Sequence, residues 1–272
     1  SNKNTLARVR YASFLYLTKD YEETINQIND IMTIDTSFNI LNRLLAYSYY
    51  ETEKYDKGLY YMNKFLNRMS PEKRICLDYL YYGRLLLKNG YDSLGLINIY
   101  KGYECDTTQT DVLNELAQAY NKLKKYEDVV NIYKIKISKE IASLTDYFLL
   151  GRTYYMLQKW EEADSIFDYV ISKKPDYLPA HLYKARSKSN MDPKMEEGLA
   201  KPYYEKYVEM AVEDSLKNSK ELVEAYDYLS FYYLTKKDLC KSRYYSQKIV
   251  ELDPKNENGI KRLQGLKNVK CN

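Results

Sequence analysis

Six residues near the middle of the chain fall at a spacing that constrains the fold of the whole sequence. They follow one another at steps of 1, 3, 9, 4 and 8 positions, and they are Leu150, Gly151, Tyr154, Ala163, Phe167 and Pro175. This order places small residues where the two helices of a hairpin touch, and a proline where the second helix ends. Because one hairpin cannot bury its apolar face alone, the pattern predicts a stack of such hairpins.

The same pattern recurs along the chain at steps of about 34 residues. The eighth position of every unit carries a small side chain, which allows two helices to approach closely. These eighth-position residues are Ala12, Ala46, Gly83, Ala117, Gly151, Ala185 and Ser230. A chance match would rarely agree at every unit, so the sequence predicts a repeat array.

The units differ in length, and the differences locate insertions. The second unit is three residues too long around Ser70 and Pro71, and the sixth is eleven residues too long. We place three of the eleven in a turn at 191–198 and eight at 214–220, because insertions between helices are tolerated at the surface. With Lys188 where other units have a large packing residue, the sixth unit is expected to be the mobile joint. The units run over 5–38, 39–75, 76–109, 110–143, 144–177, 178–222 and 223–256, and residues 257–272 are expected to form a C-terminal capping helix.

This pattern resembles that of tetratricopeptide-repeat proteins over about residues 5–256. The resemblance implies a single all-α domain: a right-handed α-solenoid of about seven helix-turn-helix repeats plus a C-terminal capping helix. The motif is specific for the fold and unspecific for the function, since function depends on the residues of a site.

The composition excludes several other classes of protein. Only 9 Gly and 6 Pro occur among 272 residues, which argues against a loop-rich or β-rich fold. The 42 basic and 38 acidic residues are too balanced for a nucleic-acid-binding surface, so we expect no nucleic-acid partner. The sequence contains no apolar run long enough for a membrane span.

The cysteines and the first residues bear on the compartment. The four cysteines lack the paired spacing and the histidine neighbours of a zinc site. Cys76 and Cys105 lie at the same end of one predicted hairpin, and an oxidising compartment would allow a disulfide between them. The chain begins Ser-Asn, which is typical of a sequence trimmed at a cleavage site. We expect a periplasmic or surface-associated location rather than a cytoplasmic one.

The sequence offers no catalytic constellation. The single histidine, His181, falls at a repeat position that is normally buried between helices, so we expect a packed core residue. Acidic pairs such as Glu161 and Glu162 are adjacent on a helix, where their side chains diverge by about 100°. No glycine-rich phosphate-binding motif occurs. We therefore expect a protein that is not an enzyme and needs no cofactor or metal.

The resemblance also implies which residues face a ligand. In tetratricopeptide repeats the first helices line a concave groove, and their second, fifth, ninth, twelfth and thirteenth positions point into it. Arginine binds carboxylates in bidentate fashion, and amides satisfy the N–H and C=O groups of an extended peptide. The candidate peptide-binding residues are Arg43, Tyr47, Arg84, Asn114, Gln118, Asn121, Phe148, Arg152, Tyr155 and Arg186.

Two functions stay open. We favour a protein-interaction scaffold that binds a protein or an extended peptide with acidic residues or a free carboxylate. The alternative is a glycan-binding or outer-membrane accessory protein, since many of the 33 tyrosines could stack on sugar faces. Exposed tyrosines gathered on one flat platform with Trp160 would favour the alternative. The sequence leaves the oligomeric state open.

Overall fold

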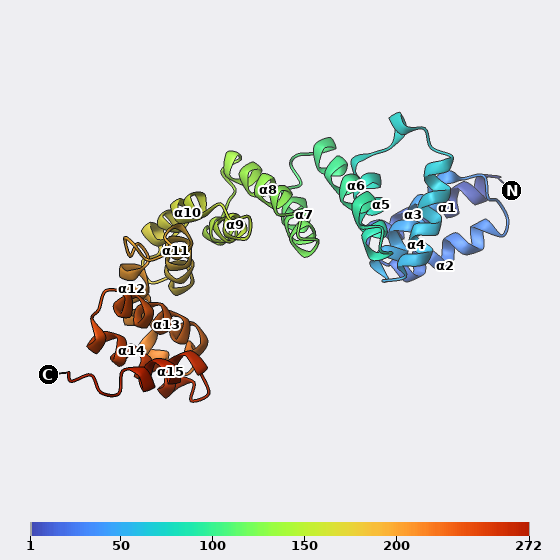
Figure 1. The fold of residues 1–272 in the computed structure, drawn as a ribbon. Coiled ribbons are helices and arrows are strands. Elements are labelled where there is room, and N and C mark those ends of the chain that lie inside the picture. Colours follow the sequence, from blue (N-terminus) through green and yellow to red (C-terminus); the bar gives the residue numbers. More distant parts are fainter. Residues whose placement is uncertain (1, 272) are drawn as a thin grey trace. The chain divides into compact units, whose positions relative to one another are not determined.

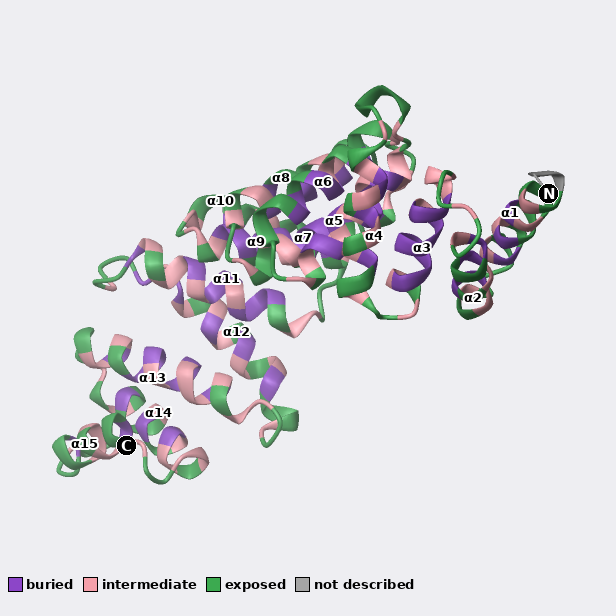
Figure 2. Cartoon of the chain, turned by 90° about the vertical axis from the view of Figure 1, so that its right-hand side faces the viewer, coloured by how far each residue is buried: buried purple, intermediate pink, exposed green. Residues whose placement is uncertain are grey.

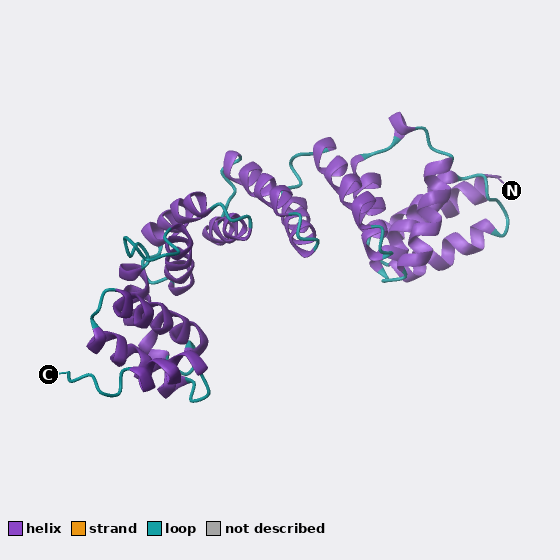
Figure 3. Cartoon of the chain, viewed as in Figure 1, coloured by secondary structure: helices purple, strands orange, loops and turns teal. Residues whose placement is uncertain are grey.

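The structure is a computed structural model and describes residues 2–271 (Figure 1). The described chain is built from fifteen α-helices and two short 3-10 helices, with no strand among these residues (Figure 3). Most of the helices follow one another as pairs joined by tight turns. The all-α helical-repeat fold that the spacing predicts is thereby confirmed.

The chain divides into two compact units, the first of which ends at Lys124. Three hairpins and one further helix make up this unit. A 3-10 turn, η1 (Pro71–Lys73), lies where the second predicted repeat is too long. The helices are α1 (Asn2–Leu17), α2 (Tyr21–Met32), α3 (Asn39–Glu51), α4 (Tyr55–Asn67), α5 (Cys76–Lys88), α6 (Asp92–Cys105) and α7 (Asp111–Lys122).

The second unit begins at Lys125, so the division falls between the two helices of the fourth predicted repeat. The long sixth repeat contains an extended turn at 192–200 and the 3-10 helix η2 (Val212–Asp214). The helices of this unit are α8 (Tyr126–Ser138), α9 (Leu144–Met156), α10 (Trp160–Lys173), α11 (Leu178–Met191), α12 (Lys201–Ala211), α13 (Ser219–Thr235), α14 (Leu239–Leu252) and α15 (Glu257–Gly265).

Small residues lie where paired helices touch, and buried residues form stripes along the helices (Figure 2). A Cβ atom added at Gly83 would lie 2.6 Å from the carbonyl oxygen of Gly95 and 2.7 Å from the amide nitrogen of Ile99. One added at Gly151 would lie 2.7 Å from the ring of Phe167. The eighth repeat position is therefore small because the neighbouring helix occupies the space of a side chain.

The turns after six of the first helices contain one residue in the left-handed conformation, and five of them share one backbone hydrogen bond. The amide after the turn residue bonds back to the last helical turn, as Asp20 does to Leu15 at 2.9 Å and Lys54 does to Tyr49 at 2.8 Å. This closure ends a helix with one residue in the left-handed conformation. The left-handed residues are Lys19, Glu53, Gly90, Lys124, Gln158 and Lys237.

Two disulfides fasten ends of helices. Cys76 and Cys105 join the start of α5 to the end of α6, with Cα atoms 5.3 Å apart, which confirms the pairing that the hairpin suggested. Cys240 on α14 is bonded to Cys271, with Cα atoms 5.5 Å apart. The repeat pattern does not predict this second bond.

The last helix is shorter than expected. α15 ends at Gly265, and the chain up to residue 271 continues as turn and coil instead of completing a helix over 257–272. Glycine weakens a helix, and the tail has competing partners on α14. Arg243 donates a 2.9 Å hydrogen bond to the carbonyl of Val269, and the Cys240–Cys271 bond holds the end of the tail.

Candidate functional site

Two of the candidate residues of the first unit belong to a buried network between α3 and α5. The guanidinium of Arg43 donates to Asp78 at 2.7 Å, and the hydroxyl of Tyr47 donates to the other carboxylate oxygen at 2.6 Å. Asp78 also accepts the amide of Ile75 at 2.8 Å, which fixes the start of α5. Tyr47 is only 2 % exposed, and burial with the adjacent Asp78 charge raises its pKa. Tyr47 therefore offers no surface to a ligand and instead joins two repeats.

Arg84 and Arg186 are each held by a glutamate of the following repeat. Arg84 on α5 donates to Glu115 on α7 through Nε at 3.0 Å and Nη2 at 2.9 Å. Arg186 on α11 makes the same two-pronged pair with Glu224 on α13, its Nε lying 2.8 Å from the carboxylate. Partial burial would lower the pKa of Arg84, but the bonds to Glu115 raise it above its ordinary value. These guanidinium groups are already used inside the protein.

Arg152 differs from Arg43, Arg84 and Arg186. It is exposed on α9, and none of the described acidic side chains forms an ion pair with it. Its guanidinium carbon lies 5.4 Å from the ring centre of Tyr183 and 5.9 Å from that of Phe148. The reason is a substitution in the repeat: Tyr183 holds the sixth position on α11, where α7 has Glu115. Arg152 thus rests on aromatic rings and keeps its N–H edge available.

The rings beneath Arg152 form a packed cluster between α9 and α11. Tyr183 lies 5.9 Å from Phe148 and 5.5 Å from Tyr155, measured between ring centres. Tyr155 in turn packs against Trp160, with ring centres 5.0 Å apart. Its hydroxyl also accepts a 3.4 Å hydrogen bond from the amide of Asn190. We call Phe148, Arg152, Tyr155 and Tyr183 the arginine–aromatic site.

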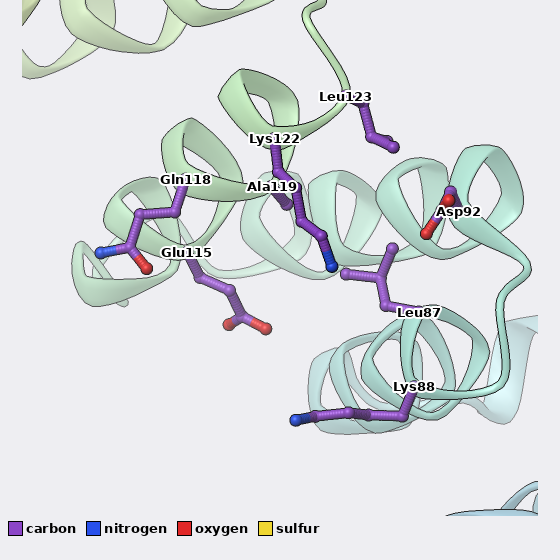
Figure 4. A pocket seen from close by; sticks show the side chains of 8 residues that line it. All are labelled: Leu87, Lys88, Asp92, Glu115, Gln118, Ala119, Lys122 and Leu123. Carbon is purple, nitrogen blue, oxygen red and sulfur yellow. The ribbon is translucent and has the colours of Figure 1, made fainter.

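A separate pocket of about 300 Å³ lies in the first unit between α5 and α7 (Figure 4). Leu87 and Leu123 give it an apolar wall. In Figure 4 the side chain of Lys122 extends from α7 toward Leu87, whereas Gln118 points away from the centre. Of the three candidate amide residues on α7, Gln118 lines this pocket, and Asn114 and Asn121 are exposed elsewhere on the helix.

The structure also shows where the histidine lies and whether metal-binding clusters or membrane-spanning helices occur. His181 is buried, and its Nε2 lies 2.8 Å from the carbonyl oxygen of Pro175, which confirms a packed core histidine. Within residues 2–271 no cluster of acidic, histidine or cysteine side chains could hold a metal ion. None of the described helices is long and apolar enough to cross a bilayer.

Exposed tyrosines are scattered over several helices. Trp160 is half-buried against Tyr155, so its ring is not part of a flat exposed surface. The most exposed tyrosines lie on α1, α4, α10 and α14 and just before α6, and they are Tyr11, Tyr60, Tyr169, Tyr244 and Tyr91.

Several solved structures share this fold, although no protein-family model matches the sequence. The C-terminal part of a TPR repeat-containing protein from Cytophaga hutchinsonii is 30% identical, with a TM-score of 0.69 over 93% of this chain and 98% of that one. The complex of Naa15/Naa10 bound to HypK-THB reaches a TM-score of 0.72 at 11% identity, over 98% of this chain and 40% of that one. YrrB, described as a TPR protein with an unusual peptide-binding site, gives 0.52 at 13% identity, over 70% and 92%. These last two likenesses concern the fold alone.

Curated relatives match a shorter stretch. Protein O-mannosyl-transferase TMTC2 from Xenopus laevis and from Homo sapiens is 32% identical over 76 residues, which is 27% of this chain. The match spans 9% of the length of those proteins.

Proposed function

The chain belongs to the tetratricopeptide-repeat family, and from this premise we propose that it is a non-enzymatic scaffold that binds a protein through an extended peptide segment. The finer part of the proposal is that the arginine–aromatic site receives an acidic group of that segment. One observation carries it: Arg152 is exposed without an internal carboxylate, whereas Arg43, Arg84 and Arg186 are all paired. The description of YrrB, which has the same fold, supports the ligand class.

The chemistry of the site suits a carboxylate. Stacking on Tyr183 and Phe148 restricts the guanidinium of Arg152 and leaves its planar N–H edge free for bidentate bonding. The hydroxyl of Tyr155 on α9 and the side-chain amide of Asn190 on α11, which bond to each other at 3.4 Å, are further polar groups for a peptide backbone. A charge-assisted hydrogen bond of this kind contributes about 1.5 to 3 kcal/mol.

The other candidate residues take different parts in this proposal. Arg43, Arg84 and Arg186 hold first helices of neighbouring repeats together, so they shape the binding surface without touching the ligand. Gln118 and Lys122, at the pocket of the first unit, supply a second region for contact with the partner.

The test begins with a displayed library of random decapeptides selected on the purified chain. Enriched peptides are expected to carry Asp or Glu, and Arg152→Gln is expected to bind them at least tenfold more weakly, since one charge-assisted bond is lost. Lys173→Gln is the matched control, because Lys173 is also an exposed cation over a ring, 5.6 Å from Tyr169, on a second helix.

Two outcomes would contradict the proposal. One is enrichment of peptides without acidic residues, and the other is equal binding by wild type and Arg152→Gln. Retention of oligosaccharides on a glycan array, with loss on Trp160→Ala, would instead favour the glycan-binding alternative.

A further inference from the structure

The insertion in the sixth repeat builds one wall of a pocket in the second unit. After α12 ends at Ala211, the chain forms η2 and then residues 215–218 before α13 begins. A pocket of about 310 Å³ lies between this segment and the start of α11. A repeat of ordinary length would lack this wall.

The pocket is apolar at its base and polar at its mouth. Leu182 and Tyr207 are 5% and 2% exposed and form the base, while Leu178 and Pro179 lie at the rim. Lys217 stands exposed on the opposite wall. Since burial of apolar surface is the main favourable interaction that such a base can offer, the pocket suits an aliphatic group.

Two of the polar groups that line the pocket already have partners. Arg186 is paired with Glu224, and the side-chain amide of Asn218 donates to the carbonyl of Ala211 at 3.2 Å. An aliphatic group entering the pocket therefore leaves neither Arg186 nor Asn218 unsatisfied.

Tyr183 connects this pocket to the arginine–aromatic site. It lines the pocket, and its ring also carries the guanidinium of Arg152 at 5.4 Å. A carboxylate on Arg152 and an aliphatic group in the pocket thus both lie next to Tyr183, on the order of 10 Å apart. An extended peptide covers that distance in about three residues.

We propose that the second unit reads a two-part motif: an acidic residue and, two to four positions away, a large aliphatic residue. This inference rests on the proposed peptide-binding function and names the feature that would distinguish one peptide from another. Arg152 selects the acidic residue, and the pocket built by the insertion selects the aliphatic one.

The test uses peptides enriched from the decapeptide library, each also synthesised with its aliphatic residue changed to Ser or its acidic residue changed to the matching amide. The change to Ser is expected to weaken binding to the wild type about tenfold, the effect of one buried aliphatic side chain. Lys217→Trp, which fills the mouth of the pocket, is expected to remove the aliphatic preference and keep the acidic one. Lys220→Trp, an exposed position outside the pocket, is the control.

The outcomes separate this inference from the proposed function. If enriched peptides share an acidic residue but no aliphatic one, or if Lys217→Trp behaves like the wild type, the motif is wrong and the peptide-binding function stands. If the library yields no acidic preference or no binder at all, both are overturned. If Lys217→Trp has a lower melting temperature than the wild type, its binding to the acidic peptides shows whether it is still folded. The inference requires that this binding is retained.

Discussion

The carboxylate of Asp192 accepts a 2.6 Å hydrogen bond from the amide of Gly198 across the turn between α11 and α12. The amides of Glu196, Glu197 and Leu199 donate to the same carboxylate. Burial would raise the pKa of Asp192, yet these four amides together hold it below its ordinary value. The irregular length of the sixth repeat predicts that this turn is mobile. In the structure, the buried side chain of Asp192 bonds its backbone together.

Asp192→Ala is expected to lower the free energy of unfolding by about 1.5 to 3 kcal/mol, because charge-assisted bonds to backbone amides are lost. Hydrogen exchange of the amides of residues 196–199 should be slow in the wild type and fast in the variant. Asp214→Ala, in the same repeat, is the control. Since the pKa of Asp192 is depressed on folding, its contribution is present above its ordinary value of 3.8 and is lost as the pH falls below it. Rapid exchange at 196–199 in the wild type would show that the turn is mobile after all.

Gly83→Ala is expected to destabilise the chain more than Gly151→Ala does. The new methyl group at Gly83 meets backbone atoms of Gly95 and Ile99, which cannot move aside, whereas at Gly151 it meets the side chain of Phe167. Overpacking of this kind costs about 1 to 3 kcal/mol. Urea unfolding of both variants measures the difference. Gly265→Ala serves as the reference, because apart from the adjacent backbone of its own helix no atom lies within 4 Å of the new methyl. Equal losses at the two glycines would argue against this packing.

The two disulfides are expected to differ in their contribution. Their sequence separations, 29 and 31, are similar, and a loop of that size contributes about 3 to 4 kcal/mol in the chain-entropy description. Replacing Cys76 and Cys105 by Ser should cost close to that amount, because both ends lie on packed helices. Replacing Cys240 and Cys271 should cost less, because the freed tail regains conformational freedom. Thermal unfolding of the two double variants, with thiol alkylation and mass measurement of the wild type, checks both points. Free thiols in protein purified under oxidising conditions would contradict the pairing.

Alkaline pH is expected to unfold the chain between about pH 10 and 12. Burial raises the pKa of Tyr133, Tyr207, Tyr228 and Tyr245 to about 12 each, from an ordinary value of 10.0. Because these pKa values are higher in the folded state, the stability they contribute is complete below pH 10 and is lost as the pH rises toward 12. Circular dichroism should show the loss of helix over this range, and tyrosinate absorbance should continue to rise as these four residues become exposed. Tyr228→Phe keeps the ring and removes one titrating group, so its loss of stability should be less steep; an unchanged slope would contradict the role of Tyr228.

The fold was predictable because its cause is local. Close helix contact demands a small residue at one repeat position, and Gly83 and Gly151 show that demand directly in the sequence. The tail was not predictable, because the apolar spacing of Ile260, Leu263, Leu266 and Val269 suggested a longer helix and thereby hid the partner of Cys240.

The site was predictable only in part. The sequence identifies arginines at one groove position, but their availability depends on residues one repeat away. Glu115 binds Arg84. At the equivalent position of the sixth repeat, opposite Arg152, the residue is Tyr183 instead of a glutamate. This difference between Glu115 and Tyr183 is visible when the repeats are aligned. Seeing it requires comparing the ninth position of one repeat with the sixth position of the next, since side chains on neighbouring first helices meet at that offset. The pairing of Arg186 with Glu224 lay beyond such a comparison, because the insertion between α12 and α13 shifts the register.

The left-handed turn residues have a consequence for how this sequence has evolved. Five of the six turns place Lys, Glu or Gln where glycine would adopt the same backbone without strain, at a cost of roughly 1 to 2 kcal/mol each. Replacing such a residue by glycine would remove this strain, but the larger entropy of the unfolded chain would offset part of the gain in stability. Selection that acts only to keep a protein above a stability threshold does not remove such small penalties. The array therefore retains several independent sites, all away from the helix faces, at which a descendant could gain tolerance for destabilising changes in its binding surface.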